Sequence, residues 1–204
     1  MLETSRIYLA SRSPRRRELL TQMGVHFDTV LFRSSARGDD IVDESVLDGE
    51  SAVDYVQRVA RAKATHGSQM AEVRHLRRQP ALSADTTIEF EDRIIGKPQD
   101  EQDAWEILRC LSGNTHRVLT CVAMADGAHM ESVLSVSEVR FRVLDDAEIR
   151  RYVASGEPMD KAGAYGIQGR AGMFVEHLSG SYTGVMGLPL CETALLLRRF
   201  NVVF

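Results

Sequence analysis

The 204-residue sequence has few cysteines and no long apolar run. Its three cysteines, Cys110, Cys121 and Cys191, lie far apart in apolar segments, so they predict buried thiols of a reducing compartment rather than a zinc cluster or a disulfide framework. No apolar stretch approaches the length of a membrane span, and the first residues do not resemble a secretory leader. We therefore expect a cytoplasmic protein that does not enter a membrane.

Several signatures of binding and catalysis are also missing. The net charge of −4 provides no broad basic excess, so we expect no general binding to nucleic acid or to a membrane surface. The six histidines are scattered without metal-ligand spacing. Neither GxSxG nor GxxxxGK[ST] is present, which argues against an α/β-hydrolase and a P-loop enzyme. With 44% hydrophobic residues and no low-complexity tract, residues 1–204 are expected to form a single domain.

Apolar periodicity and turn residues predict a mixed order of helices and strands. We expect strands at residues 7–10, 25–32, 81–88, 94–98, 115–125, 131–143 and 173–178. Helices are expected at residues 14–24, from 51 through 63 and beyond, at 100–113 and 145–154, and from 189. Residues 33–49 and 157–172 are expected to form polar loops. Because some strands pair as hairpins, we expect a mixed sheet with helices covering its faces.

The start of the first expected helix breaks a local rule. Ser13 suits the N-cap and Pro14 the first helical position, but Arg15, Arg16 and Arg17 then fill the first turn. The helix dipole disfavours exposed cations there by about 0.3 to 1 kcal/mol each. Free backbone N–H groups and guanidinium groups together favour an anion site. The alternative is a solvated charged face, to which we assign Arg17.

Other polar residues interrupt apolar surroundings in the same way. Lys63 shares the apolar stripe of its helix, where it either reaches the rim or enters a cleft. Asp85 ends an apolar strand, and Glu44, Lys97 and Lys161 lie in polar or turn segments. Each has a simpler reading as a turn, loop or edge-strand charge. Together with the two arginines they fit polyphosphate chemistry, which needs several cations, one or two carboxylates for Mg²⁺, and an activated water.

Six ordered blocks of the sequence resemble the Maf family of nucleoside triphosphate pyrophosphatases. They are LASRSPRR at residues 9–16, RVARAKA at 58–64, SADT at 83–86, GKP at 96–98, DKAGAYGIQG at 160–169, and GSY with VMGLPL between 180 and 190. The resemblance covers nearly the whole chain. It implies an elongated α/β fold similar to inosine triphosphate pyrophosphatases, with two lobes around a nucleotide cleft. It also implies metal-dependent cleavage between the α and β phosphates, which releases a nucleoside monophosphate and pyrophosphate.

The resemblance also implies roles for particular residues. Asp85 would be the proton acceptor and, with Glu44, a ligand of Mg²⁺, for which Mn²⁺ or Co²⁺ would substitute. The other implied residues bind substrate: Ser11, Arg15, Arg16, Lys63, Lys97 and Lys161 at the phosphates, and Arg15, Thr86 and Gln168 in substrate choice. The segment at residues 32–40 is longer than in typical members, so Asp43 stays an alternative to Glu44.

The form of residues 164–168 resembles the subgroup that acts on dTTP and UTP. A sister subgroup that acts on 7-methyl-GTP carries a Ser-Phe pair where Ala164 and Tyr165 stand. Two alternatives therefore stay open: a 7-methyl-GTP pyrophosphatase, and a nucleotide-binding regulator of cell division with little turnover, because the family is also associated with inhibition of septum formation. The sequence also leaves open whether the substrate is a modified nucleotide and whether the protein is a homodimer.

Overall fold

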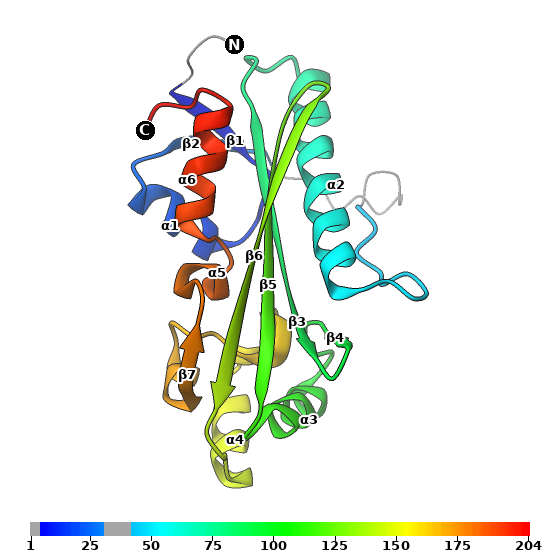
Figure 1. Ribbon diagram of the computed structural model, residues 1–204, viewed down its shortest axis with the longest axis vertical. Coiled ribbons are helices and arrows are strands. Elements are labelled where there is room, and N and C mark those ends of the chain that lie inside the picture. Colours follow the sequence, from blue (N-terminus) through cyan, green and yellow to red (C-terminus); the bar gives the residue numbers. More distant parts are fainter. Residues whose placement is uncertain (1–4, 31–41) are drawn as a thin grey trace.

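A mixed sheet runs along the length of the molecule in the computed structural model, which describes residues 5–30 and 42–204 (Figure 1). Over these residues the sheet has seven strands in the order β2-β1-β3-β5-β6-β7, with β4 paired to β3. The strands are β1 (Arg6–Leu9), β2 (His26–Thr29), β3 (Ala81–Phe90), β4 (Arg93–Ile95), β5 (Thr115–Asp126), β6 (His129–Phe141) and β7 (Val175–Ser179). β1 pairs in parallel with β2 and β3, whereas the other pairs are antiparallel. The predicted elongated, mixed α/β sheet is confirmed.

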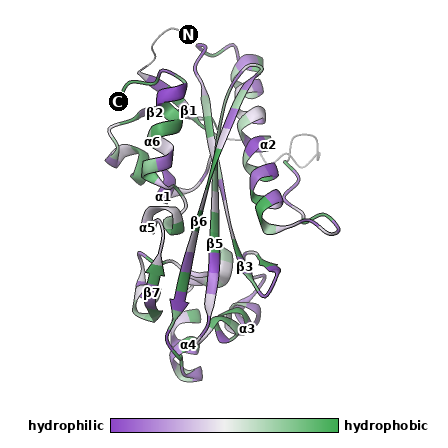
Figure 2. Ribbon diagram, viewed as in Figure 1, coloured by the Kyte–Doolittle hydropathy of each residue, from purple (hydrophilic) through white to green (hydrophobic). Residues whose placement is uncertain are grey.

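Helices cover both faces of this sheet. They are α1 (Pro14–Gln22), α2 (Ala52–Val73), α3 (Glu101–Leu111), α4 (Asp146–Val153), α5 (Tyr182–Met186) and α6 (Leu190–Arg199). Successive residues of β5 point to opposite faces: Val122 packs with α1 and α6, whereas Cys121 packs with α2. Figure 2 shows hydrophobic and hydrophilic stretches along α2 and α6, as expected for helices that lie on a sheet.

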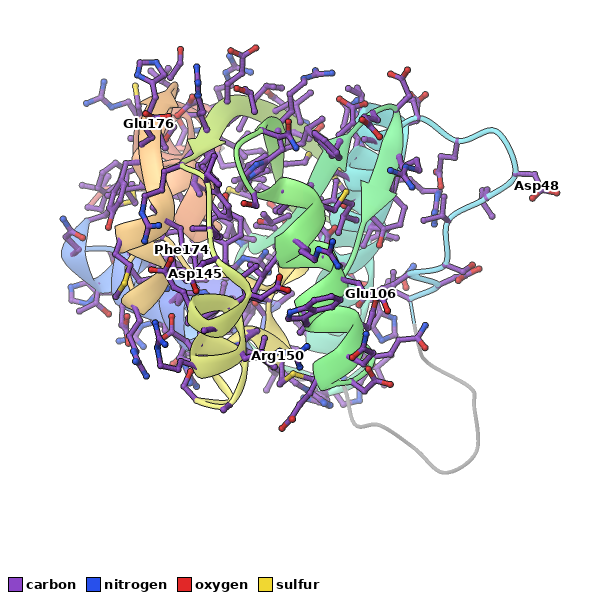
Figure 3. All side chains as sticks on the ribbon, turned by 90° about the horizontal axis from the view of Figure 1, so that it is seen from below. Asp48, Glu106, Asp145, Arg150, Phe174 and Glu176 are labelled. Carbon is purple, nitrogen blue, oxygen red and sulfur yellow. The ribbon has the colours of Figure 1, made fainter. Side chains whose placement is uncertain are left out.

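A further cluster of buried residues lies where α3 and α4 pack together, at the end of the molecule away from β1 and α6 (Figures 1 and 3). It includes Phe141 of β6 and Phe174, whose ring centroids are 6.0 Å apart. At the surface of this end, the Arg150 guanidinium lies 5.2 Å from the centre of the Trp105 ring. That residues 1–204 form a single domain of two lobes stays a prediction.

A close approach fixes α2 on the sheet. A Cβ atom at Gly67 would lie 2.7 Å from the Cβ of Ala10, so only glycine allows α2 to pass this near to the end of β1. Because the chain turns from β1 into α1 just after Ala10, this contact places α2 beside the β1–α1 turn.

The predicted helix starts are confirmed by their caps. Side chains of Ser13, Ser51, Asp100 and Asp145 each accept a hydrogen bond from a backbone N–H of the first turn. A tight hairpin turn at Gly127 and Ala128 joins β5 to β6.

Several expectations differ from the structure. Asp85, which was expected to end a strand, lies in the middle of β3. Residues 157–172 do not form one irregular loop: they contain the 3₁₀ helices Glu157–Asp160 (η1) and Ala162–Ala164 (η2) and most of Arg170–Phe174 (η3). The end of η3 also replaces the start of the strand expected at 173–178. The strand expected at residues 25–32 spans only β2, and residues 31–41, which include the longer segment, lie outside the described residues.

A last difference concerns the cysteines. Cys121 is buried, but Cys110 is half-buried and Cys191 is exposed, because Cys191 lies on the outer face of α6. Among the described residues, no helix combines the length and the apolar character that a membrane span requires.

Candidate functional site

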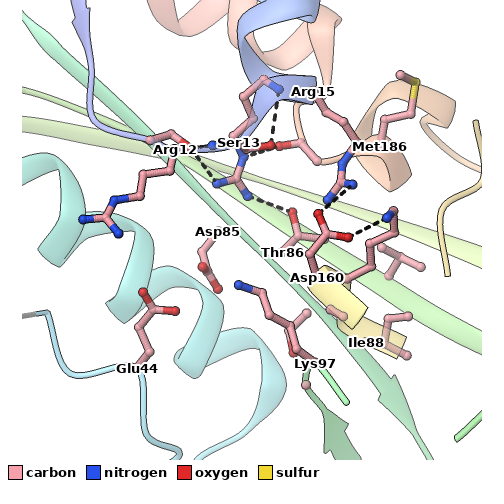
Figure 4. A pocket seen from close by; sticks show the side chains of 18 of the residues that line it. Arg12, Ser13, Arg15, Glu44, Asp85, Thr86, Ile88, Lys97, Asp160 and Met186 are labelled. Atoms are coloured by element: carbon pink, nitrogen blue, oxygen red, sulfur yellow. Dashed lines mark hydrogen bonds and ion pairs between the residues drawn. The ribbon is translucent and has the colours of Figure 1, made fainter. Parts of the chain in front are cut away.

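A cleft of about 780 Å³ opens between the β1–α1 turn, α2, the middle of β3 and the 3₁₀ helices. Side chains that lie far apart in the sequence meet in it (Figure 4). All ten residues predicted to act on substrate or metal line the cleft: Ser11, Arg15, Arg16, Glu44, Lys63, Asp85, Thr86, Lys97, Lys161 and Gln168. The alternative carboxylate, Asp43, is exposed and is not among the lining residues.

The first helix begins at the cleft as the sequence indicates. Ser13 Oγ accepts from the backbone N–H of Arg16 at 3.5 Å, and Pro14 occupies the first turn. No acidic residue lies in this turn. Arg15 and Arg16 line the cleft, whereas Arg17 is exposed outside it, as predicted. The positive end of the helix dipole and two guanidinium groups therefore lie beside the same cavity.

Hydrogen bonds hold the Arg16 guanidinium in one orientation. Its Nε donates to the Gly187 carbonyl at 2.9 Å, and its Nη1 donates to Ser11 Oγ at 3.3 Å. Its Nη2 donates to Thr86 Oγ1 at 3.3 Å. Burial lowers the pKa of Arg16, opposed by the nearby Asp85 carboxylate, but a guanidinium stays charged at neutral pH. Three of its five N–H groups are thus engaged, which leaves two for a ligand in the cleft.

The hydrogen bonds around Thr86 fix whether its hydroxyl donates or accepts toward the cleft. Thr120 Oγ1 donates to the Gly184 carbonyl at 2.8 Å, so its single proton is used there. Thr86 Oγ1 lies 2.9 Å from Thr120 Oγ1 and must donate in that bond. Toward Arg16 and the cleft, Thr86 therefore acts as an acceptor.

Two carboxylates meet at one ammonium group. Lys63 Nζ lies 2.8 Å from Asp85 Oδ1 and 2.9 Å from Glu44 Oε1. The side chains of Lys63 and Asp85 are only 15% and 11% exposed, so Lys63 enters the cleft instead of reaching the rim. Figure 4 shows Lys97 directed toward Asp85 from the other side of the cleft. Tyr55 faces the same carboxylates: burial, and then the charges of Asp85 and Glu44, raise its pKa to about 12.

At the opposite rim, Asp160 joins two of the predicted phosphate-binding cations. Its carboxylate lies 3.7 Å from Arg15 Nη1 and accepts a hydrogen bond from Lys161 Nζ. Partial burial acts to raise the pKa of Asp160, but the charges of Lys161 and Arg15 outweigh it and the net shift is downward. Asp160 was not among the predicted site residues, although its place beside Lys161 in a glycine-rich block was a signal.

Of the Ala164–Tyr165 pair, on which the predicted subgroup rests, Tyr165 lines the cleft and Ala164 is buried in the core behind it. Tyr165 is 5% exposed, and its hydroxyl lies 2.9 Å from His116 Nε2. Burial raises the pKa of Tyr165 and lowers the pKa of His116 to about 4, so both groups are neutral at pH 7.

The donor set in the cleft fits a magnesium ion. In residues 5–30 and 42–204, no group of three or more His, Cys, Asp or Glu side chains converges as a complete protein site. The Glu44 and Asp85 carboxylates, however, both contact the ammonium group of Lys63, so they lie close enough to share a cation. Mg²⁺ is usually held by one or two carboxylates together with substrate phosphates, so this pair suits it.

Comparison with known proteins gives three findings. The model of the family described as "Maf-like protein" matches residues 6–200. Proteins named dTTP/UTP pyrophosphatase are similar over nearly their whole length: one from Dechloromonas aromatica is 66% identical (96% of this chain, 98% of the relative), and one from Aromatoleum aromaticum is 60% identical (97% and 96%). The solved structure of the Staphylococcus aureus Ham1 protein aligns with a TM-score of 0.44 and 13% identity, over 67% of this chain and 71% of that one. The likeness to inosine triphosphate pyrophosphatases stays a prediction.

Proposed function

The chain belongs to the Maf family, and we propose that it hydrolyses dTTP and UTP to the nucleoside monophosphate and pyrophosphate in this cleft. Two relatives named dTTP/UTP pyrophosphatase are 66% and 60% identical to it over nearly the full chain. The observation that carries the proposal is the meeting of six cationic side chains and three carboxylates in one cavity. A triphosphate needs such a set because it carries up to about four negative charges.

In the proposed complex the cationic side chains bind different parts of the phosphate chain. Arg16 is held by protein groups at all three of its guanidinium nitrogens and offers its two remaining N–H groups to the phosphates. Arg15 and Lys161 exchange Asp160 for phosphate oxygens, and Lys63 and Lys97 approach from the side of Asp85. A guanidinium fork and several ammonium groups fix the chain in place, which is the main requirement of phosphoryl chemistry.

We propose that Asp85 accepts the proton from the attacking water. The water oxygen bonds to the α-phosphorus, the bond from that phosphorus to the α–β bridging oxygen breaks, and pyrophosphate leaves. Asp85 and Glu44 would hold Mg²⁺, which when bound would neutralise phosphate charge and lower the pKa of water. The Asp85 side chain is only 11% exposed, so a water bound beside it would be largely screened from bulk solvent.

A nucleotide panel tests this function. Purified protein with Mg²⁺ is incubated with dTTP, UTP, CTP, GTP and 7-methyl-GTP, and released pyrophosphate is measured. We expect release from dTTP and UTP well above the others. Selective release from 7-methyl-GTP would contradict the interpretation of Ala164 and Tyr165. Tight nucleotide binding without release would favour the regulator of cell division instead.

Other aspects of the proposal rest on the sequence alone. The cytoplasmic location, the absence of nucleic-acid binding and the formation of a homodimer stay predictions, as does the choice between unmodified and modified pyrimidine nucleotides.

A further inference from the structure

The segment that carries Glu44 is held by helix α2 through its backbone. Residues 42–50 form no helix or strand, and the Glu44 side chain is 51% exposed. Three successive carbonyls of this segment nevertheless accept hydrogen bonds from α2. Arg58 Nη1 donates to the Asp43 carbonyl at 3.0 Å, and Arg58 Nη2 donates to the Ser45 carbonyl at 2.8 Å. Between them, the Tyr55 hydroxyl donates to the Glu44 carbonyl at 3.0 Å.

The same guanidinium also closes the far end of the segment. Arg58 Nε lies 2.6 Å from Glu50 Oε1, and its Nη2 lies 2.8 Å from Glu50 Oε2. The Glu50 side chain is only 8% exposed and also accepts from the Leu47 N–H at 3.1 Å. The hydrogen bonds from Arg58 lower the pKa of Glu50, so this carboxylate stays ionised and paired. Arg58 thus ties residues 43, 45 and 50 to one rigid helix.

We propose that Arg58 is a positioning residue that sets the place of the Glu44 carboxylate, and this inference rests on the role of Glu44 in the proposed function. Arg58 does not reach the cleft itself, whereas Lys63, on the same helix, contacts the Glu44 carboxylate directly. Helix α2 therefore positions both the backbone and the side chain of Glu44. Without the guanidinium, an exposed carboxylate on an irregular segment would sample many positions, which weakens any cation site that it helps to form.

Only arginine has the geometry for this task. Its planar fork spreads donors over three nitrogens, so it can bond two separated carbonyls and both oxygens of one carboxylate. Lysine keeps the charge but concentrates its three donors at one nitrogen, so Arg58→Lys retains the electrostatics and loses most of the anchor. Arg61 provides a matched control, because it lies on the same helix and bonds Ser132 Oγ of β6 at 2.9 Å.

The first test measures the Mg²⁺ concentration that gives half-maximal pyrophosphate release from dTTP. Loss of groups that orient a ligand of a metal costs about 10- to 100-fold in metal affinity, so we expect a rise of that size in Arg58→Lys. Arg61→Lys should stay within about twofold of the unchanged protein. In a Glu44→Gln background, Arg58→Lys should add little, because the two residues act as one unit. An undiminished effect of Arg58→Lys in that background would overturn the proposal.

The second test needs no turnover. Hydrogen exchange of the backbone amides in residues 43–48 should accelerate in Arg58→Lys and stay unchanged in Arg61→Lys. Tyr55→Phe, which removes one hydrogen bond and keeps the ring, should give a smaller acceleration and a smaller shift in the Mg²⁺ requirement. Unchanged exchange in Arg58→Lys would refute the anchor, even if the protein loses stability. A lack of pyrophosphate release by the unchanged protein would contradict the proposed function alone, because exchange still reports on the anchor.

Discussion

Replacing Asp85 by asparagine removes the proton acceptor from the cleft while leaving its shape nearly unchanged. An amide cannot take a proton from water at neutral pH, and it is a weaker ligand for Mg²⁺ than a carboxylate. General-base catalysis contributes about 10²- to 10⁴-fold, which corresponds to about 3 to 5 kcal/mol of transition-state stabilisation. Loss of the metal ligand adds to this. We therefore expect kcat for dTTP to fall by at least about 100-fold.

The geometry predicts that this loss comes without unfolding. Lys63 keeps its ion pair with Glu44 at 2.9 Å, so no buried charge is left without a partner. Asp28→Asn is a suitable control, because Asp28 pairs with Arg6 at 2.9 Å on the surface and both side chains are about half exposed. The assay combines steady-state pyrophosphate release at saturating Mg²⁺ with thermal unfolding. If the Asp85→Asn protein keeps more than about a tenth of the normal kcat, Asp85 is not the proton acceptor.

Three further predictions concern neighbouring groups. Arg16→Lys loses the hydrogen bonds to Gly187, Ser11 and Thr86 that orient the side chain. Because hydrogen bonds to charged groups contribute about 1.5 to 3 kcal/mol, the KM for dTTP should rise by about tenfold or more. An unchanged KM would show that the Arg16 guanidinium does not bind the substrate. Addition of EDTA should abolish pyrophosphate release and Mn²⁺ or Co²⁺ should restore it, whereas full turnover in EDTA would exclude the role given to Glu44. His116 has a pKa of about 4 in the folded protein and of about 6.5 in the unfolded chain, so the unfolded chain binds the proton first as the pH falls. The free energy of unfolding therefore decreases between about pH 6.5 and pH 4, by up to about 1.4 kcal/mol per pH unit. In urea unfolding, His116→Gln should show a weaker dependence of this free energy on pH over the same range.

Local signals in the sequence were enough for many elements of the fold. Caps such as Ser13 and Asp100 act within three residues, so they can be recognised without knowledge of the rest of the chain. The β5–β6 hairpin is similarly local, because one turn sets its register. The 3₁₀ helix Arg170–Phe174 was not predicted, because its five residues are too few for a clear period.

The site was predictable in its members but not in its geometry. The resemblance identified the residues, yet the sequence could not show that Lys63 lies between Asp85 and Glu44, because the three come from separate segments. Arg58 belongs to the block at residues 58–64 but was given no role, because its partners lie in a segment without periodicity. The error at Cys191 has a similar cause: an apolar neighbourhood in the sequence does not tell which face of α6 a side chain occupies.

The most direct test of the account is hydrolysis of dTTP in water labelled with oxygen-18, with Mg²⁺ present and the products identified by mass spectrometry. Attack of water at the α-phosphorus predicts dTMP that carries the label and pyrophosphate that does not. Labelled pyrophosphate, or dTDP with orthophosphate, would contradict the reaction that we assign to the cleft.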